Sequence, residues 1–270
     1  MTVTQTETRT IEVPGGTVQY DVRGDLDADG PHRVLVLAGF PMDATGFGTL
    51  ASYFTDRPVV TYDPRPVGRS TGAHDDRPLT PQDHAEDLHR VIASLGVGPV
   101  DLFGSSGGAV NSLALVARHP EQVGSVVAHE PPLASVLPDR EPLFAACTDI
   151  YDTYESAGLG PAMAKFIALV QHTGELPATY ADQPPPDPAA FGLPTDDDGS
   201  RDDPMLGQSI RTIPQYEPVL GALGSASTRI VVAAGVESEG EMAARGAAAF
   251  AERLGVELTM FPSHHGGFLG

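Results

Sequence analysis

The sequence predicts an α/β protein with a mainly parallel central sheet of about eight strands, flanked by helices and interrupted by one helical segment. Short apolar runs, typical of strands buried on both faces, alternate with helical patterns along most of the chain. This alternation stops after Pro131-Pro132 for about ninety residues and then resumes. We therefore expect a sheet domain formed by residues 1–130 and 228–270, and a helical cap formed by 131–227.

The predicted strands are short and rich in apolar or β-branched residues. They cover 9–13, 17–22, 33–39, 58–62, 99–103, 123–128, 229–234 and 256–261. The first two flank the turn Pro14-Gly15-Gly16 and indicate an opening β-hairpin. Helical patterns fall between the others, at about 47–55, 81–95, 109–118 and 241–254. Strands that alternate with helices imply right-handed crossovers and parallel pairing.

The clearest helix boundary lies at Thr80-Pro81-Gln82-Asp83. Thr80 can cap the helix, proline suits its first turn, and the Asp83 carboxylate favours the positive end of the helix. Apolar residues follow on one face at positions 85, 88, 92 and 95, and Gly96 can end the helix.

The predicted cap contains residues at helical spacing. They mark helices over 143–154, 163–170 and 205–223. The last of these is interrupted by Pro214 and Pro218. The stretch 177–204 is rich in proline and aspartate and too polar for a core, so we expect a mobile loop there.

The stretch Gly104-Ser105-Ser106-Gly107-Gly108 lies between a predicted strand and a predicted helix. A serine in such a sharp turn adopts strained backbone angles and raises its hydroxyl above the carboxyl edge of the sheet, while flanking glycines relieve the crowding. Only Ser106 has glycine both two positions before and two positions after it, because Phe103 stands where Ser105 would need one. The alternative interpretation is a glycine-rich turn that binds nothing.

In a parallel sheet, ligand-binding groups collect beyond the carboxyl ends of the strands. Here these positions include Asp63, Ser106, Glu130, Glu237 and His265. A serine hydroxyl becomes a good nucleophile when a histidine removes its proton, and a carboxylate holds that histidine in the required tautomer. The order serine, acid, histidine along the chain is that of one recurring triad family.

Four motifs follow one another in a characteristic order. They are Gly39-Phe40-Pro41, Tyr62-Asp63-Pro64-Arg65 with Gly68-Arg69-Ser70, the turn at Ser106, and Pro262-Ser263-His264-His265-Gly266-Gly267-Phe268. In these motifs the chain resembles the serine hydrolases of the α/β-hydrolase fold, over residues 8–130 and 228–270. The resemblance implies an α/β-hydrolase core with an inserted helical cap. We expect neither a cofactor nor a bound metal.

The same resemblance implies that Ser106 is the nucleophile and His265 the base, with His264 the weaker choice. It also implies an oxyanion hole formed by the backbone N–H groups of Gly107 and Phe40. Physical chemistry agrees, because a tetrahedral intermediate places negative charge on an oxygen that fixed N–H groups can meet without reorganising.

The triad acid has two candidates. Relatives commonly place an aspartate after the strand that precedes the last helix, three residues past a glycine; here Gly235 brings Ser238 to that position and Glu237 one residue earlier. Other relatives use a carboxylate directly after the strand that follows the nucleophile. There this chain has Glu130, which the following Pro131 favours in an extended conformation. We prefer Glu130 and keep Glu237 as the alternative.

The composition excludes several classes of function. A formal net charge of −20, with one lysine among sixteen basic residues, disfavours binding to nucleic acid or to anionic membranes. The single cysteine, Cys147, rules out an intrachain disulfide and a cysteine-based metal site. No apolar run approaches the length of a membrane span, and Met1 to Thr10 lacks the features of a secretory signal, so we expect a cytoplasmic protein.

These features predict a serine hydrolase that cleaves a small to medium apolar carboxylic ester, lactone or thioester through an acyl-enzyme on Ser106. The cap offers apolar helices and no basic cluster for a phosphate. Its candidate contacts to this small-molecule substrate are Phe144, Tyr151, Tyr154 and Phe166. The alternatives are a cofactor-free perhydrolase, cyclase or lyase, or a non-catalytic ligand-binding protein on the same fold.

Overall fold

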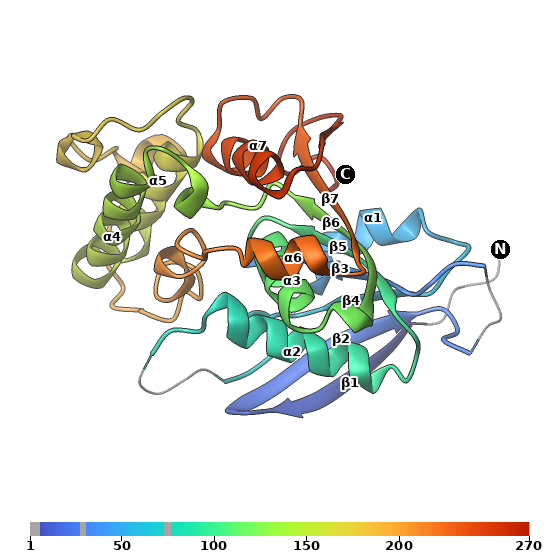
Figure 1. The fold of residues 1–270 in the computed structure, drawn as a ribbon. Helices are drawn as coiled ribbons and strands as arrows, with labels where there is room; N and C mark the ends of the chain where they lie inside the picture. Colours follow the sequence, from blue (N-terminus) through green and yellow to red (C-terminus); the bar gives the residue numbers. More distant parts are fainter. Residues whose placement is uncertain (1–5, 28–30, 73–76, 270) are drawn as a thin grey trace.

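The computed structural model describes residues 6–27, 31–72 and 77–269. These residues are arranged around one eight-stranded sheet (Figure 1). Its strands are β1 (Thr6–Val13), β2 (Gly16–Arg23), β3 (Leu35–Ala38), β4 (Val59–Tyr62), β5 (Val100–Ser105), β6 (Val123–His129), β7 (Arg229–Gly235) and β8 (Leu258–Phe261). They lie side by side in the order β1-β2-β4-β3-β5-β6-β7-β8. All the predicted strands are present, with bounds close to those expected.

The sheet is mainly parallel. β1 and β2 form the predicted hairpin, in which Val13 pairs with Gly16, and β2 also pairs antiparallel with β4. The remaining neighbouring pairs, from β4 and β3 to β7 and β8, are parallel. β3 lies inside the sheet and is buried along its whole length, as its continuous apolar sequence predicts. The predicted α/β fold is confirmed.

Helices cover both faces of the sheet. They are α1 (Gly48–Ser52), α2 (Pro81–Ser94), α3 (Gly107–Arg118), α6 (Leu220–Ser225) and α7 (Met242–Leu254). Helices α2, α3, α6 and α7 share one apolar core with the sheet, with Leu88, Leu113 and Phe250 fully buried in it. A smaller core lies on the other face, where α1 and the preceding Phe47 pack against Leu37.

The start of α2 follows the prediction. The Thr80 side chain accepts a hydrogen bond from the Asp83 amide, and the Asp83 carboxylate accepts one from the Thr80 amide, so that the two residues form a capping box. At the other end, Leu95 is the cap residue and Gly96 has a φ of 69°, a left-handed conformation that glycine adopts without strain.

Residues 130–228, between β6 and β7, form a helical insertion; α6 at its end packs on the sheet, and much of the rest has an apolar core of its own. Its long helices are α4 (Arg140–Ala157) and α5 (Leu159–Val170), in agreement with two of the three predicted helices. Figure 1 shows α4 and α5 packed together and set apart from the sheet.

The prediction of a third helix over 205–223 is wrong. This stretch holds turns, the short 3₁₀ helix Ser209–Arg211 and the beginning of α6. The reason lies in Pro214 and Pro218, because proline has no N–H to donate to the helical ladder and disfavours helical angles in the residue before it. Apolar spacing alone therefore misled the prediction at this point.

The proline-rich stretch 177–204 is largely exposed, as its polar composition predicts. It contains two short 3₁₀ helices, Tyr180–Asp182 and Pro188–Phe191. Further 3₁₀ helices lie at Ala44–Phe47, Pro120–Gln122 and Ala134–Val136. Within the described ranges, no helix combines the length and the apolar character needed to cross a membrane.

Candidate active site

Ser106 lies in the turn between β5 and α3, with backbone angles φ 56° and ψ −128°. Such a positive φ is strained for a residue other than glycine. The neighbouring glycines let the turn pack closely. A Cβ atom at Gly104 would lie 2.5 Å from the Ser112 hydroxyl, and one at Gly108 would lie 2.2 Å from the Ala38 carbonyl oxygen. The motif thus forms the strand, sharp turn and helix that its sequence predicts.

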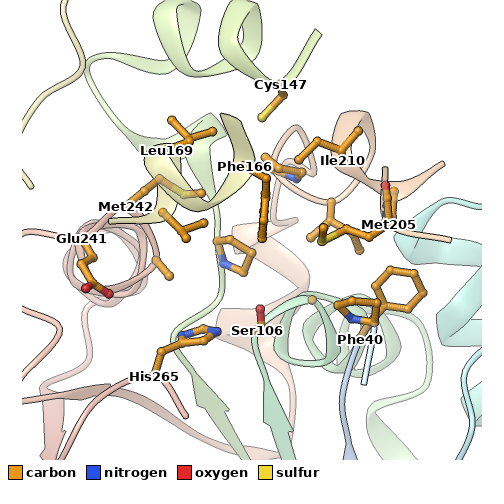
Figure 2. Close-up of a pocket in the computed structure, with 18 of the residues that line it drawn as sticks. Phe40, Ser106, Cys147, Phe166, Leu169, Met205, Ile210, Glu241, Met242 and His265 are labelled. Atoms are coloured by element: carbon orange, nitrogen blue, oxygen red, sulfur yellow. Dashed lines mark hydrogen bonds between the residues drawn. The ribbon is translucent and has the colours of Figure 1, made fainter. Parts of the chain in front are cut away.

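Ser106 opens onto a cavity of about 470 Å³ between the sheet and the helical insertion (Figure 2). Figure 2 shows Ser106, His265 and Phe40 together on one side of this cavity. The opposite walls consist mostly of apolar side chains: Cys147, Phe166, Leu169, Val170, Met205, Ile210, Ile213 and Met242. A serine and a histidine therefore share one apolar chamber.

His265 is held by Glu130. Glu130 Oε2 accepts a hydrogen bond from His265 Nδ1 at 2.5 Å, and Oε1 accepts one from the Gly235 amide at 2.7 Å. The Glu130 side chain is 0% exposed, and its backbone φ is 45°, so the extended conformation expected of the residue before Pro131 is wrong. Burial opposes the charged form, but the hydrogen bonds from His265 and Gly235 outweigh it and keep the pKa of the Glu130 carboxyl below its usual range.

The second ring nitrogen of His265, Nε2, has no hydrogen-bond partner within the described residues. Figure 2 shows the His265 ring beside the Ser106 hydroxyl. A contact between a nucleophile and its base commonly tightens only when a substrate binds. With Nδ1 donating to Glu130, Nε2 is the nitrogen that can accept a proton from Ser106.

The alternative acid, Glu237, is exposed in the turn after β7. It forms neither a hydrogen bond nor an ion pair with His265 in the part of the chain that is described. His264, the weaker choice for the base, is also exposed, and its Nδ1 accepts a hydrogen bond from the Gly266 amide at 3.1 Å. The geometry therefore joins His265 to Glu130, whereas Glu237 and His264 point elsewhere.

The two expected oxyanion donors lie against each other. A Cβ atom at Gly107 would lie 3.0 Å from the Phe40 carbonyl oxygen, so the start of α3 packs directly on the loop after β3. Neither the Gly107 amide nor the Phe40 amide donates to a protein group among the described residues. Both residues line the cavity beside Ser106, which leaves two N–H groups available to an oxygen atom bound there.

His129, to which the sequence analysis gave no role, lies beside His265 with ring centroids 6.0 Å apart. It is buried, stacks on Phe103, contacts Phe268 edge-on, and has its Nδ1 atom 3.0 Å from the Ser105 hydroxyl. Burial lowers the pKa of His129, which favours a neutral ring beside Glu130 and His265. Its position at the carboxyl end of β6, directly before Glu130, is the sequence signal that places it at this edge of the sheet.

Asp63, another carboxylate at this edge of the sheet, is used to shape loops. Its oxygens accept hydrogen bonds from the Ala44 amide at 3.0 Å and from the Arg69 amide at 2.8 Å. Burial opposes its charged form, but the hydrogen bonds from Arg69 outweigh this effect and lower the pKa of the Asp63 carboxyl. Within residues 6–27, 31–72 and 77–269, no three His, Cys, Asp or Glu side chains gather as a metal site requires.

Of the four aromatic residues expected to contact a substrate, the structure brings Phe166 to the cavity. Phe144, Tyr151 and Tyr154 are not among the residues that line it. Tyr154 is buried in the core of the insertion, and Tyr151 lies under the Arg211 guanidinium at 3.5 Å from the ring centroid. Helical spacing marks an apolar face, but it does not tell whether that face meets a core or a cavity.

Comparison with known proteins places this chain in a family. The sequence profile described as "alpha/beta hydrolase fold" matches residues 32–177, which is more than half of the 270-residue chain. The chain belongs to the α/β hydrolase fold family. The uncharacterized hydrolase YraK of Bacillus subtilis is 39% identical to this α/β hydrolase over 133 residues, which cover 49% of the chain and 47% of the relative. The chain thus spans about half the length of the curated relatives it matches.

Solved structures share the α/β hydrolase fold over almost the whole chain. An esterase from Thermogutta terrifontis superposes with a TM-score of 0.66 at 16% identity, covering 98% of this chain and 93% of that one. The thioesterase domain from the curacin biosynthetic pathway gives a TM-score of 0.64 at 16% identity, covering 98% and 95%. At such identities the likeness establishes the fold alone, and the predicted α/β-hydrolase fold is confirmed.

Proposed function

We propose that this protein is a serine hydrolase that cleaves small to medium apolar carboxylic esters, lactones or thioesters through an acyl-enzyme on Ser106. One observation carries the proposal. Ser106, which has a strained backbone, shares an apolar cavity with His265. The Nδ1 atom of His265 is hydrogen-bonded to the buried carboxylate of Glu130. This is the arrangement that activates a serine hydroxyl, because it combines a nucleophile, a base and a group that orients the base.

In the first half of the reaction, the Ser106 oxygen attacks the substrate carbonyl while His265 Nε2 accepts the hydroxyl proton. Glu130 accepts the Nδ1 hydrogen bond and stabilises the imidazolium that forms. The Gly107 and Phe40 amides donate hydrogen bonds to the oxyanion of the tetrahedral intermediate. His265 then protonates the leaving group, and the acyl group remains on Ser106.

In the second half, a water molecule gives its proton to His265 Nε2, and its oxygen attacks the acyl carbonyl. A second tetrahedral intermediate forms in the same oxyanion hole. Its collapse breaks the bond to Ser106, which takes the proton back from His265, and the carboxylic acid leaves. The proposed cycle uses no cofactor.

The cavity favours an uncharged acyl group. Its described walls contain no arginine or lysine, and Glu241 is the acidic residue that lines it. An anionic acyl chain would lose its hydration there without gaining a cationic partner, which is unfavourable. The esterase and the thioesterase that share the fold support oxygen and sulfur esters as the substrate classes to test.

A phosphonate probe that reacts with activated serines tests the proposal. We expect one adduct, on the peptide that contains Ser106, together with turnover of p-nitrophenyl esters that the probe abolishes. Ser106→Ala is the control and is expected to show neither. Folded protein that takes no label at Ser106 contradicts the proposal. Labelling without ester turnover would instead favour a non-hydrolytic enzyme or a binding protein.

A further inference from the structure

Ser238 carries a buried hydroxyl without a hydrogen-bond partner. The residue is 0% exposed, and its Oγ atom makes no hydrogen bond to another described residue. Buried hydroxyls in native proteins are nearly always paired, because an unpaired one has lost its hydration for nothing. The buried, unpaired Ser238 hydroxyl therefore calls for a structural or functional explanation.

The backbone brings Ser238 to the triad. β7 ends at Gly235, whose amide donates to Glu130 Oε1 at 2.7 Å. The chain then turns, so that the Ser238 amide donates back to the Gly235 carbonyl at 3.2 Å, and the Glu241 amide donates to the Ser238 carbonyl at 3.0 Å. Ser238 is thus fixed on a hydrogen-bonded turn whose first residue already binds Glu130.

The Glu130 carboxylate has capacity for a further donor. It accepts one hydrogen bond from Gly235 and one from His265, whereas an ionised carboxylate offers about four acceptor sites. The Ser238 side chain also lowers the pKa of the Glu130 carboxyl, after larger effects of burial, His265 and Gly235. A hydroxyl on the turn that begins at Gly235 is therefore placed to use one of the remaining acceptor sites of this carboxylate.

We propose that Ser238 is a positioning residue, whose hydroxyl donates to Glu130 and holds that carboxylate charged and directed at His265. This role rests on the proposed function of the triad. It matters most when His265 becomes an imidazolium, because Glu130 must then stabilise the charge without rotating away. The other titratable ring facing the pair is His129, which stays neutral because burial lowers its pKa.

Two variants weaken the donor to different degrees. Ser238→Ala removes it, and Ser238→Cys replaces the hydroxyl by a thiol, which is a weak donor of similar size. Ser135→Ala is the matched control. Ser135 is also buried, and its hydroxyl donates to the Tyr216 carbonyl at 2.6 Å, within the insertion. The readouts are kcat, KM and the pH profile of kcat/KM with p-nitrophenyl butyrate, and the low-field proton resonance of His265 Nδ1–H.

For Ser238→Ala we expect kcat to fall about tenfold with little change in KM, which is the effect of about 1.4 kcal/mol and is typical of a hydrogen bond to a charged group. The acid limb of the profile is expected to move to higher pH. Without the Ser238 donor the pKa of the Glu130 carboxyl is lowered less, so this carboxyl takes up its proton at a higher pH. For Ser238→Cys we expect values of kcat and of the acid limb between those of Ser238→Ala and wild type. Ser135→Ala is expected to leave the acid limb unchanged.

A folded Ser238→Ala variant with a wild-type acid limb and an unmoved His265 resonance would overturn the proposal. If the alanine variant does not fold, the same comparison with Ser238→Cys decides. The resonance is measured without substrate, so it tests the contact between Ser238 and Glu130 independently of ester hydrolysis. A shifted resonance in a protein that takes no phosphonate at Ser106 would refute the hydrolase function and leave this contact standing.

Discussion

Glu130 and Glu237 offer a matched test of the triad acid, because each glutamate follows one of two neighbouring strands, β6 and β7. We predict that Glu130→Gln lowers kcat roughly 10⁴-fold, a loss typical of a triad whose acid becomes an amide. Glu237→Gln is expected to stay within about twofold of wild type, since an exposed side chain that does not touch the base removes no transition-state interaction.

The predicted size of the effect follows from the two hydrogen bonds of Glu130. The Gly235 amide donates to Oε1, so the glutamine oxygen stays at that position and the NH₂ group faces His265. His265 Nδ1 must then accept a hydrogen bond where it now donates one. The ring proton moves to Nε2, which is the nitrogen that has to take the proton of Ser106. A histidine fixed in this tautomer cannot act as the base.

Initial rates with p-nitrophenyl butyrate measure kcat and KM for both variants, and thermal unfolding checks that each is folded. Phosphonate labelling of Ser106 is expected to slow in parallel with kcat in Glu130→Gln only. The reasoning is refuted if Glu130→Gln retains more than about a tenth of wild-type kcat, or if Glu237→Gln loses as much as Glu130→Gln.

Three further predictions concern the scaffold. Asp87→Asn leaves the buried Arg65 guanidinium without its ion-pair partner and is expected to cost about 3–5 kcal/mol of unfolding free energy by urea denaturation; a loss below about 1 kcal/mol would contradict this. Thr80→Ala removes the cap of α2 and is expected to cost about 1 kcal/mol in the same assay, so unchanged stability would argue against the capping box. Gly108→Ala pushes α3 away from the loop that carries Phe40, the proposed oxyanion donor, and is expected to lower kcat about 10²–10³-fold. Gly98→Ala is its control, because a Cβ atom there meets open space, and equal rates for the two variants would count against the argument.

The strands and the turn at Ser106 could be predicted because their signals are local. A buried parallel strand has to be apolar along its length, as β3 is, and the capping box at Thr80 needs residues that are three apart in sequence. The serine turn likewise depends on neighbouring glycines. Each of these features depends on fewer than about ten consecutive residues, so it can be recognised without knowledge of the tertiary contacts.

The choice between the two acids could not be derived from pattern in the same way. Both glutamates follow adjacent strands, and what separates them is the direction in which each turn projects its side chain. Glu130 turns inward with a positive φ, whereas Glu237 faces solvent while its neighbour Ser238 is buried. Such directions are set by packing between distant segments, including the loop that carries His265.

The helical insertion was the least predictable part for a related reason. Tyr154 and Phe166 each belong to an apolar helical pattern, yet the first is buried in a core and the second lines the cavity. The spacing of apolar residues shows that one helix face is shielded from water, but it does not show whether a core or a cavity lies against that face. The stretch 205–223 shows the opposite limit, since two prolines overrode an apolar spacing that favoured a helix.

The strained backbone at the site has a consequence for how this protein can be stabilised. The described residues other than glycine with positive φ are Ser106, Glu130 and Ser263, at 56°, 45° and 72°. Two are proposed members of the triad, and the third lies two residues before His265. Each such conformation costs of order 1 kcal/mol or more. Glycine would adopt these angles without that strain, but it would remove all three side chains. Substitutions at these positions that relieve strain therefore lower the proposed activity. Stabilising substitutions are better placed elsewhere in the scaffold.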